Sequence, residues 1–205
     1  MKKLLLVLSY LVVSVTYAAG FKPVEGKDYK IVALPPTSQQ EPGKVEVKEF
    51  FSFGCIHCKD VDPMVEEQLV PNKKVVLNRI QVVWNDDATI MTFAKLNATI
   101  QILGLTKLYT PTFNAVFNGD TLNSDAQVQG FLTKSGLTTS QVKQFMDTYN
   151  SFTVSAKVGQ YKDMTKSYNI TGTPTFIVAN KYVVSPALPE QLIQVVQFLV
   201  NKASK

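Results

Sequence analysis

The chain's only two cysteines and its only histidine lie within four residues, in the run Cys55-Ile56-His57-Cys58. A closed zinc site takes four cysteine or histidine ligands, so these three residues cannot form one, and we expect neither a metal nor another cofactor. A cysteine protease needs a histidine distant in the sequence, and the chain has none. Two thiols at this spacing can instead exchange with the thiols of another molecule, making and breaking disulfides.

The spacing assigns different roles to the two thiols if a helix begins at the first one. Unpaired backbone N–H groups and the positive end of the helix dipole would favour the thiolate of Cys55 and lower its pKa, making it the attacking sulfur. Cys58, one turn into the helix, would resolve a mixed disulfide. A protonated His57 would further stabilise the thiolate and hence the reduced form, which makes the disulfide a better oxidant.

Two other interpretations of the cysteine pair are a structural disulfide and two ordinary buried thiols. A bridge across so short a loop gains only about 2 kcal/mol in the chain-entropy estimate, less than a bridge across a longer loop. Unpaired buried thiols have no reason to be neighbours in an exported chain. A redox-active Cys55–Cys58 disulfide is therefore the interpretation that we adopt.

The elements around the motif indicate a βαβ unit. Residues 45–53 are rich in β-branched and aromatic side chains and predict a strand; residues 55–69 predict a helix that Pro63 should kink or divide. Residues 75–84 are apolar enough for a buried parallel strand. A C-x-x-C motif that follows a strand and opens a helix within such a unit is typical of a thioredoxin-like redox site.

The rest of the chain predicts a mixed sheet that a block of helices interrupts. A short strand is expected at 29–32, helical periodicity runs from 87 to 168, and strands return at 175–178 and 181–184 before a last helix that begins at Pro189. We therefore expect an α/β protein with a thioredoxin-like fold, formed by 19–86 and 169–205, and an inserted helical domain at 87–168.

The first residues have the layout of a secretory signal peptide: Met1-Lys2-Lys3, an apolar run over 4–15, then small residues at Thr16 and Ala18. We expect residues 1–18 to be removed by cleavage after Ala18. The alternative is a membrane anchor, but the run is shorter than the roughly 20 residues that span a bilayer. Without Lys2 and Lys3, 19 of the 21 basic residues remain, against 16 acidic residues. This surplus of positive charge is too small to indicate nucleic-acid binding.

Gly172-Thr173-Pro174 lies just before the strand at 175–178. In thioredoxin-like folds, a cis-proline at this chain position faces the active-site disulfide and leaves the preceding backbone free to pair with a substrate. That resemblance implies a cis Thr173–Pro174 bond and a substrate-binding role for both residues. The alternative is an ordinary proline at the edge of a sheet.

Glu49 shares one face of its strand with apolar side chains, because side chains alternate along a strand; these are Val45, Val47, Phe51 and Phe53. Either Glu49 is a solvated charge at a strand edge, or it is a partly buried carboxyl with a raised pKa that relays protons to Cys58. Glu46 and Lys48, on the other face, are expected to be solvated.

Glu49-Phe50-Phe51-Ser52-Phe53 running into Cys-x-His-Cys resembles the DsbA family of periplasmic thiol:disulfide oxidases. The similarity continues over nearly all of the mature chain, at Thr110-Pro111, Asn150-Ser151-Phe152, Gly172-Thr173-Pro174 and Lys181-Tyr182. The resemblance implies a thioredoxin domain with an inserted helical domain, and a periplasmic enzyme that oxidises thiol pairs in newly exported, unfolded proteins. It also implies reoxidation by a membrane quinone reductase of the DsbB type.

Two positions depart from the family's commonest pattern. Ile56 replaces a proline, and Thr173 stands where the oxidases often have valine; threonine at this position is commoner in the isomerases. We therefore expect Ile56, His57 and Glu49 to tune the redox poise. A disulfide isomerase or reductase is one alternative, and a non-catalytic periplasmic peptide-binding chaperone is another. Residues 19–43 are too few for the dimerisation domain of dimeric isomerases, so a monomer is expected.

Overall fold

The structure, a computed structural model, describes residues 21–35, 41–184 and 187–204. The predicted signal peptide at 1–18 lies outside these residues. Among the helices within the described ranges, none has both the length and the apolar character that crossing a membrane requires.

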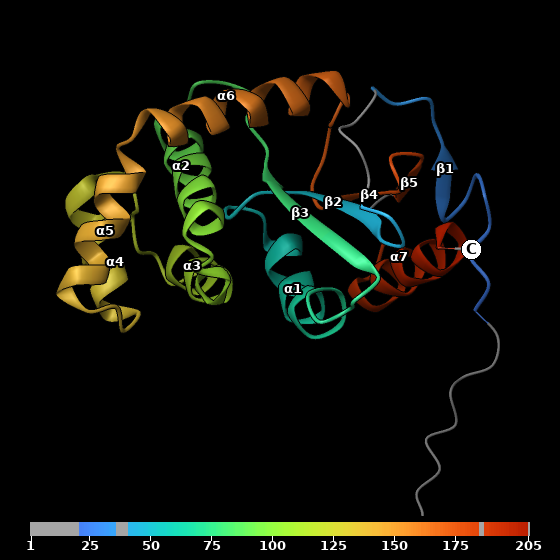
Figure 1. Ribbon diagram of the computed structural model, residues 1–205, viewed down its shortest axis with the longest axis horizontal. Coiled ribbons are helices and arrows are strands. Elements are labelled where there is room, and N and C mark those ends of the chain that lie inside the picture. Colours follow the sequence, from blue (N-terminus) through green and yellow to red (C-terminus); the bar gives the residue numbers. More distant parts are fainter. Residues whose placement is uncertain (1–20, 36–40, 185–186, 205) are drawn as a thin grey trace, which may run out of the picture.

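A mixed sheet of five strands forms the centre of the molecule, as predicted (Figure 1). The strands lie in the order β1-β5-β4-β2-β3. Strands β2 and β3 are parallel, and the other neighbours are antiparallel. The strands are β1 (Tyr29–Ile31), β2 (Val45–Phe51), β3 (Val75–Gln81), β4 (Thr175–Val178) and β5 (Tyr182–Val184).

Helix α1 (Ile56–Met64) follows β2 and passes directly into a π-helical turn, η1 (Val65–Leu69). Pro63 lies inside α1, where it cannot donate the usual backbone hydrogen bond. The helix continues past it and then widens, with the N–H of Val70 donating to the carbonyl of Val65 at 3.0 Å. The expected division therefore takes the form of a change in helical pitch.

The segment between β3 and β4 is helical and gathers beside the sheet (Figure 1). Its elements are α2 (Ala88–Leu103), the 3-10 turn η2 (Thr106–Leu108), α3 (Tyr109–Phe117), α4 (Asp125–Lys134), α5 (Thr139–Tyr149) and α6 (Phe152–Ser167). Helix α3 lies within the range predicted to be helical, but the hydrophobic pattern did not single it out as a separate helix. Pro111 fits because the first turn of a helix has N–H groups without intrahelical partners.

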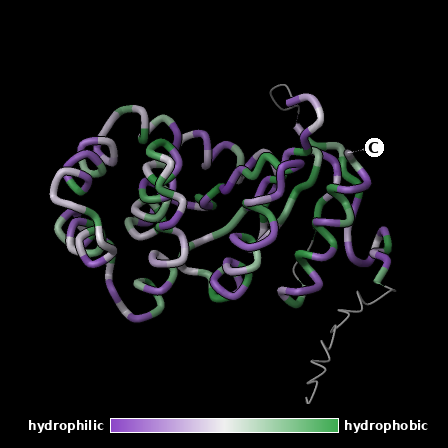
Figure 2. Tube along the Cα trace, turned by 60° about the horizontal axis from the view of Figure 1, so that its bottom comes forward, coloured by the Kyte–Doolittle hydropathy of each residue, from purple (hydrophilic) through white to green (hydrophobic). Residues whose placement is uncertain are grey.

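Both faces of the sheet are covered. Helix α7 (Pro189–Ala203), with proline in its first turn, packs with α1 over one face, where Val47 and Leu192 are fully buried. Phe50 and Ile177 on the other face meet α2 and α6. Figure 2 shows hydrophobic residues along the central strands and alternating character along the helices.

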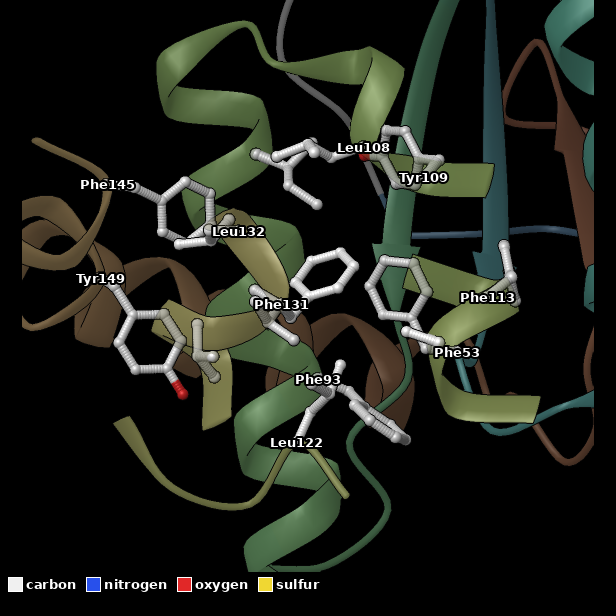
Figure 3. Close-up of a cluster of buried hydrophobic side chains, with 14 of the residues drawn as sticks. Phe53, Phe93, Leu108, Tyr109, Phe113, Leu122, Phe131, Leu132, Phe145 and Tyr149 are labelled. Atoms are coloured by element: carbon white, nitrogen blue, oxygen red, sulfur yellow. The ribbon is translucent and has the colours of Figure 1, made fainter. Parts of the chain in front are cut away.

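A third buried cluster joins the end of β2 to the helical segment. Phe53 packs edge-on against Phe113 and Phe93, with ring centroids 5.1 and 6.0 Å apart. Leu132 and Phe145 complete it from the far helices (Figure 3). The segment just before the cysteine motif is thus fixed by a core that both parts of the chain build.

Candidate active site

Cys55 occupies the N-cap of α1, directly after the turn that ends β2. The N–H of Phe53 donates to the Gln81 side chain at 3.0 Å, and the N–H of Cys55 donates to the Ser52 carbonyl at 3.0 Å. These bonds fix the turn. Cys55 is half-buried, whereas Cys58, inside the first turn of the helix, is fully buried.

Several donors converge on the Cys55 sulfur and lower the pKa of this thiol to about 5. The largest cause is a hydrogen bond from the Cys58 thiol; partial burial opposes it, and the Thr173 side chain and the backbone N–H groups of Cys58 and His57 reinforce it. The Thr173 carbonyl oxygen lies 3.4 Å from the sulfur and would accept a hydrogen bond from the thiol form. The donors to the sulfur have the larger effect, so the pKa of Cys55 is still lowered. The pKa of Cys55 is lowered as predicted, but the Cys58 thiol contributes more to this shift than the backbone N–H groups of the helix start do.

The pKa of Cys58 is raised, chiefly because the side chain is buried and also because it donates to Cys55 and feels that charge. In the reduced protein at neutral pH, Cys55 is therefore a thiolate and Cys58 is a thiol. The pair is chemically asymmetric although the two residues are only one turn apart.

The loop before β4 supplies the other wall of the site. Its Thr173–Pro174 peptide bond is cis, as predicted, and Thr173 lies against Cys55. The loop is held by two further bonds: the Thr175 hydroxyl donates to the Gly172 carbonyl at 2.8 Å, and the Trp84 indole N–H donates to the Ile170 carbonyl at 2.7 Å.

Ile56 and His57 are both exposed beside the sulfur. Ile56 is 45% exposed and carries no polar group toward Cys55. His57 acts on the thiolate through its backbone N–H. Any influence of either side chain on the redox poise stays a prediction.

Glu49 is fully buried, so the interpretation as a solvated strand-edge charge is wrong. Burial raises the pKa of Glu49, opposed by Arg79, whose Nε lies 2.6 Å from a Glu49 oxygen. Lys48, expected to be solvated, is only 2% exposed and pairs with Glu46. Its buried stem lies near Tyr168, where the ammonium is 5.6 Å from the ring centroid.

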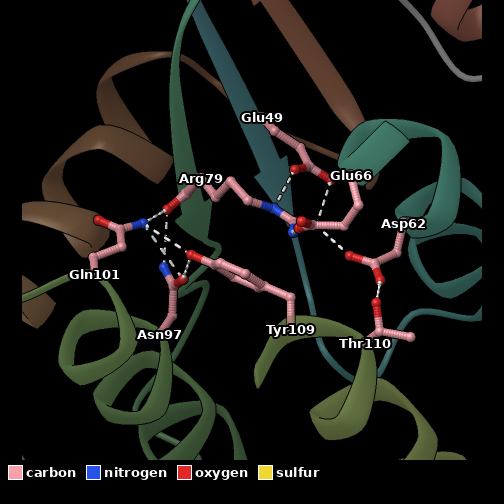
Figure 4. Close-up of polar contacts among 8 residues, drawn as sticks. All are labelled: Glu49, Asp62, Glu66, Arg79, Asn97, Gln101, Tyr109 and Thr110. Atoms are coloured by element: carbon pink, nitrogen blue, oxygen red, sulfur yellow. Dashed lines mark hydrogen bonds and ion pairs between the residues drawn. The ribbon is translucent and has the colours of Figure 1, made fainter. Parts of the chain in front are cut away.

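Arg79 is the residue that sequence reasoning missed. It is directly opposite Glu49 in the parallel β2–β3 register and also binds Asp62 at 2.9 Å and Glu66 at 3.0 Å (Figure 4). Its guanidinium lies 3.9 Å from the centroid of the Tyr109 ring. An arginine within a mainly apolar predicted strand was the available signal, since a buried charge requires partners.

This buried charge cluster (Glu49, Asp62, Glu66 and Arg79) contains three carboxyl groups and one cation. The Thr110 hydroxyl on α3 donates to Asp62 at 2.5 Å, so the cluster joins the sheet, α1 and the helical segment. The charge of Glu49 contributes to the raised pKa of Cys58. In the described parts of the chain, no group of three or more histidine, cysteine or acidic residues is arranged to hold a metal ion.

Comparisons with known proteins agree with this geometry. Residues 77–196 match the family described as "DSBA-like thioredoxin domain". The chain is 35% identical to the thiol:disulfide interchange protein DsbA of Burkholderia cepacia, over 98% of this chain and 97% of that protein. It is 32% identical to the protein of the same name from Pseudomonas syringae pv. tomato, over 90% and 87%.

Solved structures share the fold over nearly the same span. Reduced DsbA1 from Neisseria meningitidis has a TM-score of 0.76 and 28% identity, over 91% of this chain and 96% of that one. A second oxidoreductase from the same organism, NmDsbA3, has a TM-score of 0.72 and 26% identity, over 88% and 97%.

Proposed function

The chain belongs to the DsbA family of thiol:disulfide oxidoreductases, and from that premise we propose that it donates a Cys55–Cys58 disulfide to thiol pairs in newly exported, unfolded proteins. The observation that carries the proposal is the opposite direction of the two pKa shifts. A low pKa at Cys55 stabilises the reduced form and so makes the disulfide a stronger oxidant.

The reaction proceeds in two thiol–disulfide exchange steps. A substrate thiolate attacks Cys55 Sγ, the Cys55–Cys58 bond breaks, and Cys58 leaves and takes up a proton. A second substrate thiolate then attacks the substrate sulfur of the mixed disulfide and expels Cys55 as a thiolate. The substrate loses two electrons, and the protein's cysteine pair gains them. The low pKa of Cys55 speeds the second step, since a more acidic thiol is a better leaving group.

Glu49 is proposed to be the proton partner of Cys58. It would supply the proton that Cys58 takes up when the disulfide opens, and accept that proton when the disulfide forms again. Cys58 is fully buried, so its proton cannot come directly from bulk solvent. Glu49 is a carboxyl whose charge Cys58 senses and whose raised pKa keeps it able to hold a proton. That combination supports a relay.

Thr173 and Pro174 are proposed to dock the substrate chain. The Thr173 carbonyl lies beside the reactive sulfur, where an extended substrate segment would pair with the loop. Backbone pairing tolerates many sequences, as an enzyme acting on varied unfolded proteins requires. Ile56 and His57 are proposed to set the poise from the rim of the same site.

We also propose that the protein acts as a monomer in the periplasm after cleavage behind Ala18, and that a membrane quinone reductase of the DsbB type reoxidises it. The support is the signal-like layout of residues 1–18 and the family.

The deciding experiment is equilibration of the purified protein with glutathione buffers, together with oxidation of a dithiol peptide. We expect a potential more oxidising than that of glutathione and stoichiometric oxidation of the peptide. A potential more reducing than glutathione would point to a reductase. Peptide binding that survives replacement of both cysteines, without any oxidation by the intact protein, would point to a chaperone.

A further inference from the structure

Strand β3 forms one open edge of the sheet, and the backbone groups of its partly exposed residue Leu77 point outward from that edge. The N–H of Val45 donates to the Lys74 carbonyl, and the N–H of Val82 donates to the Phe51 carbonyl. In a parallel ladder this register turns the backbone groups of Val76 and Asn78 toward β2 and those of Leu77 and Arg79 outward.

The protein caps part of this edge with its own side chains. The Arg79 carbonyl accepts from Asn97 at 2.9 Å and also from Gln101. The N–H and carbonyl of Leu77 have no hydrogen-bond partner within 21–35, 41–184 and 187–204. The backbone of Gln81 also points outward, but that residue is fully buried, so Leu77 is the accessible position on β3 where another strand could bond.

A cavity of about 390 Å³ lies along this part of the edge. Val75 and Leu77 contribute its strand side, and Val70, which is 46% exposed, and Thr106 line it from the neighbouring segments. The cavity thus offers half-exposed apolar walls on both sides of the free Leu77 groups.

The charged side of the cavity is acidic. Glu66 and Arg79 line it, and behind them lie Glu49 and Asp62 (Figure 4). Arg79 is the only cation among the cavity-lining residues and already binds three carboxyl groups. The Glu66 side chain remains 29% exposed, and burial together with Asp62 raises its pKa despite Arg79. Tyr109, also lining the cavity, adds no positive charge.

We propose that this groove binds an extended polypeptide segment by strand addition to Leu77, with a lysine or arginine side chain of the segment paired to Glu66. Both groups of Leu77 can bond to a single residue of an antiparallel strand. One of the apolar side chains two positions away on the same face then lies opposite Val75, on the side of the cavity that Val70 also lines, and the other lies opposite Arg79. That the segment belongs to an unfolded substrate rests on the proposed function; the binding itself does not.

The test uses a blocked peptide without cysteine, valine-threonine-lysine-threonine-valine, and a matched peptide with norleucine in place of lysine. Backbone amide exchange is followed by NMR in the otherwise unaltered protein. We expect the lysine peptide to slow exchange at Leu77 while leaving Asn78, already bonded to β2, unchanged. No protection at Leu77 with either peptide would overturn the proposal. Protection that instead grows with protein concentration alone would assign the edge to a second copy and also overturn it.

The charge is tested by Glu66→Gln, with the exposed neighbour Glu67→Gln as the matched control. Glu66→Gln should weaken the lysine peptide about fivefold, as a partly exposed ion pair permits, and leave the norleucine peptide unaffected. Equal affinities of the two peptides for the unaltered protein would refute the cationic preference. Because the peptides contain no thiol, these results are independent of whether the protein is an oxidase, which the glutathione titration decides separately.

Discussion

At the scale of single residues, Cys55 and Cys58 show how far a position within one helical turn can separate two identical groups. Cys55 receives hydrogen bonds at the helix start, and Cys58 is enclosed by the core. The hydrogen-bond donors around Cys55 stabilise its thiolate, which exists only in the reduced protein and only above the pKa of this thiol. Their contribution to the free energy of folding therefore depends on pH and on redox state.

We expect the reduced protein to be more stable than the oxidised protein at neutral pH, with the difference shrinking in acid. The folded pKa of Cys55, about 5, lies below that of a free thiol, about 8.5. Such a depressed pKa contributes stability that is complete above the unfolded value and is lost as the pH falls through the folded one. Urea unfolding of both forms between about pH 8 and about pH 4 measures this; a pH-independent difference would contradict it.

Glu49→Gln should slow the exchange of the Cys58 proton by about tenfold or more, because the amide cannot carry it. Single-turnover oxidation of a dithiol peptide should slow, while alkylation of Cys55 in the reduced protein should keep nearly its normal rate. Glu46→Gln, a substitution on the opposite face of the same strand, is the control. Equal oxidation rates in the Glu49 variant and the parent would remove Glu49 from the mechanism.

At the scale of elements, the sequence predicted those with a clear hydrophobic pattern: β2, β3, β4 and α7 all occur where expected. Helix α3 was not identified as a separate helix within the helical range, and its Pro111 is compatible with a helix because it lies in the first turn. The Glu49–Arg79 pair was also missed. Pairing across strands depends on register, which a single sequence does not reveal.

The β4–β5 turn offers a test at this scale. Ala179 and Asn180 have positive φ of 52° and 48°, the conformation of a two-residue hairpin turn that favours glycine. Ala179→Gly should therefore stabilise the protein by about 1 kcal/mol, measured by urea unfolding.

Asn180→Gly is the contrasting substitution. It would relieve less strain, because asparagine adopts positive φ more readily than alanine does. It would also lose the bonds that Asn180 makes, donating to the Pro35 carbonyl and accepting from the Tyr168 hydroxyl. We expect it to be less stable than Ala179→Gly. The reverse order would show that the turn conformation is not limiting.

At the scale of the whole molecule, the buried charge cluster ties the helical segment to the sheet. Arg79 lies on β3, its partners Asp62 and Glu66 on α1 and η1, and Tyr109 and Thr110 on α3. No periodicity in the sequence indicates such a junction, because it is assembled from polar residues of separate elements.

Arg79→Met should destabilise the protein by about 3–5 kcal/mol, because it leaves buried carboxyl groups without their cation. The loss should lessen as the pH falls and those groups become protonated. Thermal or urea unfolding as a function of pH tests both statements. A loss below about 1 kcal/mol would be typical of exposed pairs and would mean that the cluster is not a structural junction.

Trp84, bonded to the Ile170 carbonyl just ahead of Thr173, is the only tryptophan of the chain. The protein therefore carries a single indole, which can be excited selectively over its tyrosines; this side chain is half-exposed and lies against the loop that is proposed to meet the substrate. We expect its emission to change when a mixed disulfide forms at Cys55, so that docking and release can be timed optically without an attached dye.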